Sequence, residues 1–179
     1  RAYLIREGSA TQITKDQSLM QRLVDAGELT EEEAEKSERK NIILQALGPD
    51  ERVRVDLTHQ AICRGDSVLL CSDGLSGLVT KEEIAEDVSQ DKDLVKISAE
   101  LIALANERGG PDNITVIVAR FSGNGLPEPG EAEKVGHEVY PLTDTESTTE
   151  PVPVYKGSDA PKPQGSTMIA AGAAAAAIV

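Results

Sequence analysis

The chain has 179 residues, so it is long enough for one domain with its own hydrophobic core and needs no disulfide framework or structural metal merely to fold. Aromatic residues make up only 2% of it, so the core must be built from Leu, Ile, Val and Ala. The formal net charge of −13 repels the phosphate backbone of nucleic acids, which argues against a nucleic-acid binder and leaves metal cations and protein substrates as compatible partners.

The first elements alternate between strand and helix patterns. "RAYLIRE" and "ATQIT" predict a β-hairpin that turns at Gly8 and Ser9. "QSLMQRLVDAG" places apolar residues on one face of a helix that stops at Gly27. Thr30 and Glu33 have the spacing of a capping box, which predicts a second helix ending near Lys40.

The middle of the chain predicts two strands and two further helices. "RVRVDLTHQ" alternates apolar and charged residues and predicts a half-buried strand, whereas "DSVLLCS" is more uniformly apolar and predicts a strand covered on both faces. A capping box at Thr80 predicts a helix through about Val88, and "DLVKISAELIALANERG" predicts another that stops at Gly109. "NITVIVARF" predicts a closing strand, so the pattern favours a layered α/β or α+β domain.

Two aspartates stand next to predicted strands. Asp73 follows "SVLLCS" directly and is itself followed by Gly74, which leaves room for a ligand or another backbone. Asp112 precedes the closing strand in "GGPDNITVIV". Carboxylates suit Mg²⁺ or Mn²⁺, although Asp-Gly and Pro-Asp are also ordinary turn formers, so spacing alone leaves both interpretations open.

The cysteines and the strand histidine carry no clear chemistry. Cys63 and Cys71 lie in apolar surroundings without metal-ligand spacing, and we interpret them as small buried thiols of a reducing compartment, which predicts a cytoplasmic location. No arginine follows Cys71 at the spacing of a phosphate-cradling loop. His59 on an alternating strand is typical of a surface residue rather than of a general acid.

The last third of the chain has a different composition. Residues 122–166 are rich in Pro, Gly, Ser, Thr and acids and predict a disordered linker. Met168–Val179 is uncharged but shorter than the roughly 20 residues of a membrane-spanning helix. We expect residues 167–179 to be the start of such a helix, and Lys156 and Lys162 favour a cytoplasmic preceding side. An alanine-rich soluble tail is the alternative.

Three separated motifs, taken together, resemble one known family. "DQSLMQRLVDAGELTEEEAEKSERKNIILQALG", "LLCSDGLSGLVTKEEI" and "ERGGPDNITVIVARF" are similar, in order, to the C-terminal half of bacterial metal-dependent serine/threonine protein phosphatases of type 2C, the PPM family. The likeness covers residues 1–121, with a flap over about residues 16–48. "RAYLIREG" resembles the segment that comes after the family's Gly-Asp-Ser element, with Arg1 as a possible remnant of that element.

The resemblance implies a fold and a metal centre. The fold would be a four-layer sandwich of two antiparallel sheets flanked by helices. Asp73 and Asp112 would bind metal, Gly74 and Asn113 would support them, and the intact domain would hold roughly two or three Mn²⁺ or Mg²⁺ ions. The family's upstream acidic residue, bridging Asp-Gly pair and phosphate-binding arginine have no match in this chain.

The implied activity is hydrolysis of phosphoserine and phosphothreonine on proteins, with phosphorylated proteins and serine/threonine kinases as partners. The attacking group would be a metal-activated water, so no catalytic side chain is expected in this chain, which we expect to be inactive alone. A phosphatase acting on an anti-sigma-antagonist partner and a noncatalytic pseudophosphatase remain alternatives. An upstream Asp-Gly pair and a phosphate-binding arginine would indicate the enzyme. The membrane helix would tether this cytoplasmic domain to the inner membrane.

Overall fold

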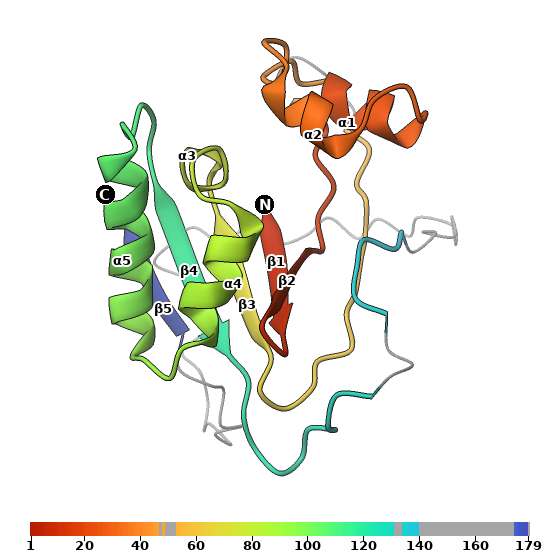
Figure 1. The fold of residues 1–179 in the computed structure, drawn as a ribbon. Coiled ribbons are helices and arrows are strands. Elements are labelled where there is room, and N and C mark those ends of the chain that lie inside the picture. Colours follow the sequence, from red (N-terminus) through yellow and green to blue (C-terminus); the bar gives the residue numbers. More distant parts are fainter. Residues whose placement is uncertain (47, 49–52, 131–133, 140–173, 179) are drawn as a thin grey trace, which may run out of the picture.

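A computed structural model describes residues 1–46, 48, 53–130, 134–139 and 174–178 (Figure 1). Its centre is one antiparallel sheet in the order β2-β1-β3-β4-β5. The strands are β1 (Ala2–Arg6), β2 (Ser9–Gln12), β3 (Ser67–Cys71), β4 (Thr115–Arg120) and β5 (Ala174–Ile178). The helices are α1 (Leu19–Asp25), α2 (Glu31–Lys36), α3 (Asp73–Ser76), α4 (Lys81–Ser89) and α5 (Leu94–Glu107). The α+β prediction is confirmed, whereas a second sheet is not found in these ranges.

The predicted hairpin is present, but its turn is at Glu7 and Gly8 and not at Gly8 and Ser9, since Ser9 already belongs to β2. Glu7 and Gly8 both have positive φ, 50° and 80°, which is the twist that a two-residue turn needs between β1 and β2. The register pairs Tyr3 with Gln12 and Arg6 with Ser9. β1 also pairs with β3 on its other side, so the hairpin brings the chain start to the centre of the sheet.

Both predicted capping boxes are formed. The side chains of Thr30 and Thr80 accept hydrogen bonds from the backbone of Glu33 and Glu83, whose carboxylates accept in return. The second helix ends at Lys36, not near Lys40 as the sequence predicted. The Ser37 hydroxyl accepts a hydrogen bond from Arg39 N, and the polar residues beyond it offer no apolar face to hold a further turn.

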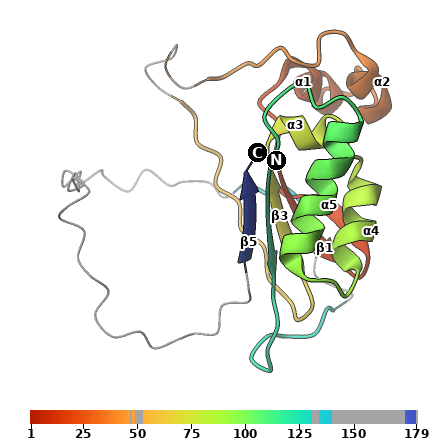
Figure 2. The ribbon, with the colours of Figure 1, turned by 90° about the vertical axis from the view of Figure 1, so that its left-hand side faces the viewer.

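The hydrophobic core lies between one face of the sheet and two helices. Figure 2 shows α4 and α5 together on that side of the strands. Side chains of β1, β3 and β4 meet those of the helices there, and the fully buried members include Leu69, Ile84, Ile97, Leu101, Val116 and Val118. The alternation of buried and exposed positions along β3 follows from this one-sided packing.

The prediction that "DSVLLCS" is covered on both faces is wrong for this structure. Leu69 is buried under the helices, but Leu70 on the opposite face is 45% exposed. Within the described ranges, helices pack on one face only, so an apolar residue of the central strand remains accessible.

The predicted strand "RVRVDLTHQ" is also absent. Residues 53–60 belong to no named strand, and Val55 and Leu57 are 69% and 48% exposed. The backbone of Arg54 is bonded instead by the Gln45 side chain, at 2.9 and 2.8 Å. A segment that alternates apolar and charged residues forms a strand only when a neighbouring strand can hydrogen-bond to its backbone. No described segment pairs with residues 53–60 in this way.

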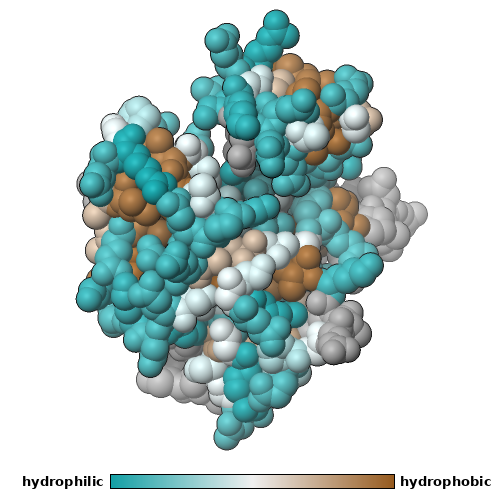
Figure 3. Space-filling view, in the orientation of Figure 1, coloured by the Kyte–Doolittle hydropathy of each residue, from teal (hydrophilic) through white to brown (hydrophobic). Residues whose placement is uncertain are grey.

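Between β2 and β3 the chain leaves the sheet and forms the flap, described over residues 16–46 and 48. Figure 1 places α1 and α2 beyond the end of the sheet at which α3 lies. The segment that returns from α2 pairs with the segment before α1, through Leu19 N to Ile42 O at 2.9 Å and Leu44 N to Gln17 O at 2.8 Å. Figure 3 shows hydrophobic residues at the flap surface, where Ile43 is 64% exposed.

The predicted linker and membrane helix lie mostly outside the described residues. Residues 122–130 and 134–139 form no helix or strand. Of the segment 167–179, the structure describes only Ala174–Ile178, which form β5 and not part of a helix. The outer edge of β4 offers unpaired backbone groups that an extended segment can bond, and β5 pairs with it. No described helix is long and apolar enough to cross a bilayer, and the membrane helix stays a prediction.

Glu83 joins α4 to α5 and makes stability depend on pH. Arg108 donates to its carboxylate at 2.8 Å, and the Thr80 backbone N–H donates at 3.0 Å. These hydrogen bonds, that of Arg108 first, lower the pKa of Glu83 to about 2 from 4.5. Because the pKa of Glu83 is lower in the folded than in the unfolded state, its ionised carboxylate stabilises the fold above pH 4.5. This stabilisation is lost as the pH falls toward 2.

We therefore expect Glu83→Gln to lower the melting temperature by a few degrees at pH 7, since the side chain is 34% exposed and the ion pair is screened. The difference from the unmutated chain should shrink as the pH falls from about 5 toward 2. Thermal unfolding followed by circular dichroism at several pH values measures it, with exposed Glu82→Gln as the control. A difference that does not change with pH would contradict the assignment.

Candidate functional site

The predicted site lies where β3 ends and α3 begins. Asp73 is the first residue of α3, and its side chain is exposed at the end of the central strand. Ser72 before it has extended backbone and occupies the N-cap position, but its side chain makes no capping hydrogen bond. The carboxylate of Asp73 is therefore held at a fixed point of the sheet while remaining accessible to solvent.

Asp112 lies in the connection between α5 and β4. Its residue is exposed, and its Oδ1 accepts a hydrogen bond from the backbone N–H of Asn113 at 2.7 Å. This bond restrains the carboxylate against its own turn and leaves the second oxygen, Oδ2, available for another ligand. β4 is antiparallel to β3, so the start of β4 meets the end of β3 at one edge of the sheet.

Ser72 joins the two aspartate-bearing turns. Its Oγ donates to Asn113 O at 2.8 Å and accepts from Thr115 N at 3.0 Å, and its own N–H donates to Thr115 O at 3.1 Å. Three hydrogen bonds thus hold the residue before Asp73 against the residues after Asp112. The structure brings the two predicted ligands to the same region, whereas no pattern in the sequence indicates that Ser72 connects them.

Gly74 allows the two turns to approach each other. The residue is buried, and a Cβ added to it would lie 2.5 Å from Asn113 O, closer than side-chain carbons approach a carbonyl oxygen. The sequence interpretation that Gly74 makes room for another backbone therefore matches the contact. That Gly74 and Asn113 support bound metal stays a prediction.

Arg1 lies beside the same end of the sheet. Its backbone extends the pairing of β1 with β3, since Cys71 N donates to Arg1 O at 3.0 Å. Its guanidinium does not extend freely: Nη2 donates to Asp16 Oδ2 at 2.7 Å and Nε to the same oxygen at 3.1 Å. Burial alone would raise the pKa of the Asp16 carboxyl, but the hydrogen bonds and charge of Arg1 outweigh it and lower that pKa.

The Arg1–Asp16 ion pair attaches the start of the flap to the end of the sheet next to Asp73. Gln12 strengthens it by donating to Asp16 Oδ1 at 3.0 Å. The family resemblance pointed to Arg1 but not to Asp16, because the two residues are 15 positions apart and no sequence pattern links them. The role of Arg1 as part of a Gly-Asp-Ser-Arg element stays a prediction.

The two aspartates do not by themselves form a complete metal site. Carboxylate oxygens are suitable ligands for Mg²⁺ and Mn²⁺. The described ranges contain no group of three or more His, Cys, Asp or Glu side chains arranged to hold an ion. Asp73 and Asp112 therefore fit a divalent cation that other groups also hold, and they do not by themselves form a complete cage.

The cysteine nearest the site is unsuited to nucleophilic chemistry. Both thiols are free of disulfides; Cys63 is buried and Cys71 is partly buried. Burial raises the pKa of the Cys71 thiol above its usual value, which disfavours the reactive thiolate. This agrees with the absence of an arginine-containing phosphate loop after it.

Comparison with curated proteins identifies relatives. The chain is 46% identical over 119 residues to the serine/threonine protein phosphatase PstP of Mycobacterium tuberculosis, which covers 66% of this chain and 23% of that protein. It is 41% identical over 122 residues to the protein phosphatase PhpP of Streptococcus pneumoniae, covering 68% of this chain and 50% of that one. The chain thus spans at most about half the length of these relatives. No family model matches the chain.

Solved structures give the same result. The serine/threonine phosphatase of S. agalactiae superimposes with a TM-score of 0.63 at 41% identity, over 69% of this chain and 50% of that one. The M. tuberculosis phosphatase PstP/Ppp gives a TM-score of 0.63 at 45% identity, over 69% and 52%. The catalytic domain of PstP in complex with two manganese ions gives a TM-score of 0.56 at 44% identity, over 66% and 47%.

Proposed function

Since this chain belongs to the bacterial type 2C (PPM) family of serine/threonine protein phosphatases, we propose that the whole protein hydrolyses phosphoserine and phosphothreonine on other proteins with Mn²⁺ or Mg²⁺. The observation that carries the proposal is the set of hydrogen bonds at Ser72, which hold the turns of Asp73 and Asp112 together. The similarity of the chain to known phosphatases indicates what these two carboxylates would bind. Because the chain spans only part of each relative, the activity is proposed for the whole protein and not for these 179 residues alone.

The residues of this chain would hold and orient the metal. Asp73 would offer its carboxylate from a helix start fixed on the central strand, and Asp112 would offer the oxygen that its own turn leaves free. Ser72 would act as a positioning residue, since it sets the spacing of the two turns. When bound, the metal would lower the pKa of a coordinated water so that hydroxide is available near neutral pH. The rest of the protein would supply the remaining ligands and the group that binds the substrate phosphate.

We infer that the remainder of the protein also completes the fold. The face of the sheet that carries Leu70 is apolar and has no helix layer within the described ranges. A second antiparallel sheet packed on this face would bury it and produce the four-layer sandwich expected from the sequence. The manganese-bound PstP structure supports a two-metal centre for the assembled domain.

Partners and location follow from the same proposal. The substrates would be phosphorylated proteins, including serine/threonine kinases. The segment from residue 122 onward would tether the domain at the inner face of a membrane if the run ending at Val179 continues as an apolar helix. Fractionation of cells expressing the natural full-length protein would test the tether: recovery of the phosphatase wholly in the soluble fraction would exclude it.

The 179-residue chain by itself should not hydrolyse phosphate esters. Two carboxylates cannot fix a binuclear centre without further ligands, and the chain has no match to the family's bridging aspartate or phosphate-binding arginine. Turnover of p-nitrophenyl phosphate with Mn²⁺ should equal that of a blank. Activity well above the blank that disappears in Asp73→Asn would contradict this prediction.

The whole protein should, in contrast, release phosphate from a phosphothreonine peptide only when Mn²⁺ or Mg²⁺ is added. Phosphate release measured with and without EDTA tests the proposed function. A folded full-length protein that binds metal but releases no phosphate from any phosphopeptide would favour the pseudophosphatase alternative.

A further inference from the structure

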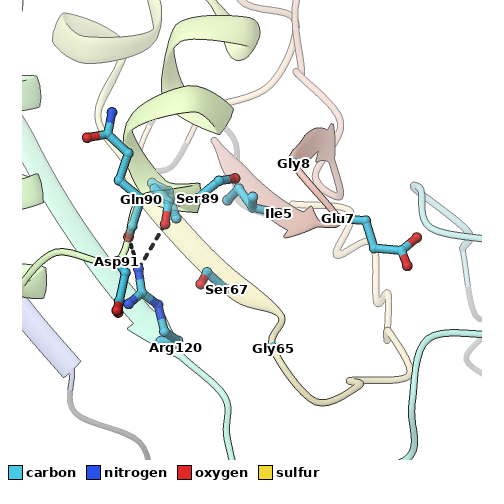
Figure 4. A pocket seen from close by; sticks show the side chains of 10 residues that line it. Ile5, Glu7, Gly8, Gly65, Ser67, Ser89, Gln90, Asp91 and Arg120 are labelled. Atoms are coloured by element: carbon cyan, nitrogen blue, oxygen red, sulfur yellow. Dashed lines mark hydrogen bonds between the residues drawn. The ribbon is translucent and has the colours of Figure 1, made fainter.

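A hollow with both polar and apolar walls (Figure 4) lies at the start of β3 and the end of β4, whereas Asp73 and Asp112 flank the other ends of these strands. Its volume is about 260 Å³. The wall residues come from β1 and its turn to β2, the start of β3, the end of α4 with the residues after it, and the end of β4. They include Ile5, Ser67, Val88, Asp91 and Arg120. The proposed phosphatase chemistry uses none of them.

The Ser67 hydroxyl forms part of the floor and has no protein partner among the described residues. The residue is only 3% exposed, and its side chain makes no hydrogen bond within the described part of the chain. Ser67 is paired directly with Arg120 across β3 and β4, so the two side chains are neighbours on one face of the sheet. Ser67 lines the hollow, so its hydroxyl is available to bond a group from outside the chain.

Arg120 is held in place by the end of α4. Its Nη2 donates to Val88 O at 2.9 Å and to Gln90 O at 3.0 Å, as the dashed lines in Figure 4 show. The N–H groups of Nε and Nη1 have no hydrogen-bond acceptor among the described residues. Nη2 therefore holds the guanidinium in place, while Nε and Nη1 still have N–H groups to donate. A planar pair of donors of this kind suits a carboxylate.

The rim of the hollow carries negative charge. Asp91 is exposed just beyond α4 and forms no ion pair with Arg120 in the described structure. The carbonyl end of α4 adds a partial negative charge on the same side. The Glu7 carboxylate points away from Arg120 in Figure 4, so it contributes little. The hollow thus has hydrogen-bond donors of Arg120 and Ser67 on its inner surface and the negative charge of Asp91 at its edge.

We propose that this hollow binds a free α-amino acid with a small aliphatic side chain. The carboxylate is bound by Arg120 and Ser67, the ammonium group lies toward Asp91 and the end of α4, and the side chain contacts Ile5 and Val88. A phosphate dianion fits poorly, because Asp91, the helix end and the net charge of −13 all repel it. A volume of 260 Å³ is small for a drug-sized ligand and is sufficient for a small amino acid.

Titration of the isotope-labelled full-length protein with valine, followed by amide NMR spectra, tests the proposal. We expect saturable shifts at Gly8, Gly65, Ser67 and Asp91 with a dissociation constant of about 0.1–10 mM, as small ligands of this kind allow. Valinamide, which lacks the carboxylate, should bind at least about 10-fold more weakly. Absence of saturable shifts at these amides up to about 50 mM valine, or equal binding of valinamide, would overturn the proposal.

Two variants separate the contacts. Ser67→Ala removes no protein hydrogen bond in the described structure, so the chain should fold normally, yet its valine affinity should fall about 10-fold. Asp91→Asn should lower the affinity for valine by a similar factor. It should leave the affinity for N-acetylvaline unchanged, because the acetyl group removes the ammonium charge that Asp91 would attract. Ser122→Ala, an exposed serine outside the hollow, is the control. Unchanged valine affinity in Ser67→Ala would exclude this site.

Discussion

In the full-length protein, Asp73→Asn and Asp112→Asn should each lower metal-dependent phosphate release at least about 100-fold. Each change replaces a charged oxygen ligand by a neutral amide of the same shape, at an exposed position where the substitution disturbs no core packing. The loss should therefore appear in metal affinity and turnover and not in stability. A manganese titration of phosphate release from a phosphothreonine peptide measures both.

The matched control for these variants is Glu86→Gln, which also removes one exposed negative charge but lies on α4 away from both turns. It should leave turnover within about two-fold of the unmutated protein, since surface substitutions of this kind have small effects. Near-normal activity of either aspartate variant across the titration, with a normal circular dichroism spectrum, would show that the ligand assignment is wrong.

Gly74→Ala should lower the free energy of unfolding by about 1–3 kcal/mol and also impair turnover. The added methyl group would lie 2.5 Å from the backbone oxygen of Asn113, which cannot move away as a flexible side chain could. Relief requires the turn of Asp73 to separate from the turn of Asp112, so the hydrogen bonds of Ser72 should weaken at the same time. Denaturant unfolding and phosphate release, measured on the same preparation, test both effects.

Gly125→Ala provides the comparison, because a Cβ at that position has nothing within 4 Å. Its unfolding free energy should stay within about 0.5 kcal/mol of the unmutated protein. If Gly74→Ala were equally harmless, the close approach of the two turns would not be a feature of the protein in solution.

The elements that the sequence predicted correctly are those determined by their own residues. Thr30 and Thr80 begin helices because each finds a glutamate three residues later, and the β1–β2 hairpin turns at a glycine. The helix over Leu94–Glu107 shows its buried face as a repeat of apolar residues. In these cases the information is local, so periodicity and capping suffice.

The failures concern features that depend on distant partners. Residues 53–60 alternate like a strand, but a strand also needs a neighbour for its backbone, and the alternation contains no information about one. Leu70 was expected to be covered, whereas the described structure places helices on only one face of the sheet. The identity of the covering layer is not encoded in the pattern of β3.

For the site, the sequence pointed to two candidate ligands but not to the groups that hold their turns together. Asp73, Gly74 and Asp112 attracted attention because they stand in turns beside apolar strands, and their metal role was predicted from the family resemblance. Ser72 and Asp16 were missed because their hydrogen-bonding partners are 41 and 15 residues away, respectively. An ordinary serine before a helix and an ordinary aspartate after a strand acquire their roles only when the sheet is assembled.

The insertion of the flap between β2 and β3 has a consequence for how the fold tolerates change. β1 pairs with both β2 and β3, so the sheet register is set on either side of the inserted segment and not by its length. The entropy of closing such a loop rises only logarithmically, by about 0.6 kcal/mol for each doubling of its length. A shortened, lengthened or exchanged flap should therefore leave the register of the strands unchanged. The flap, which extends beyond the end of the sheet at Asp73, can vary while the sheet itself does not.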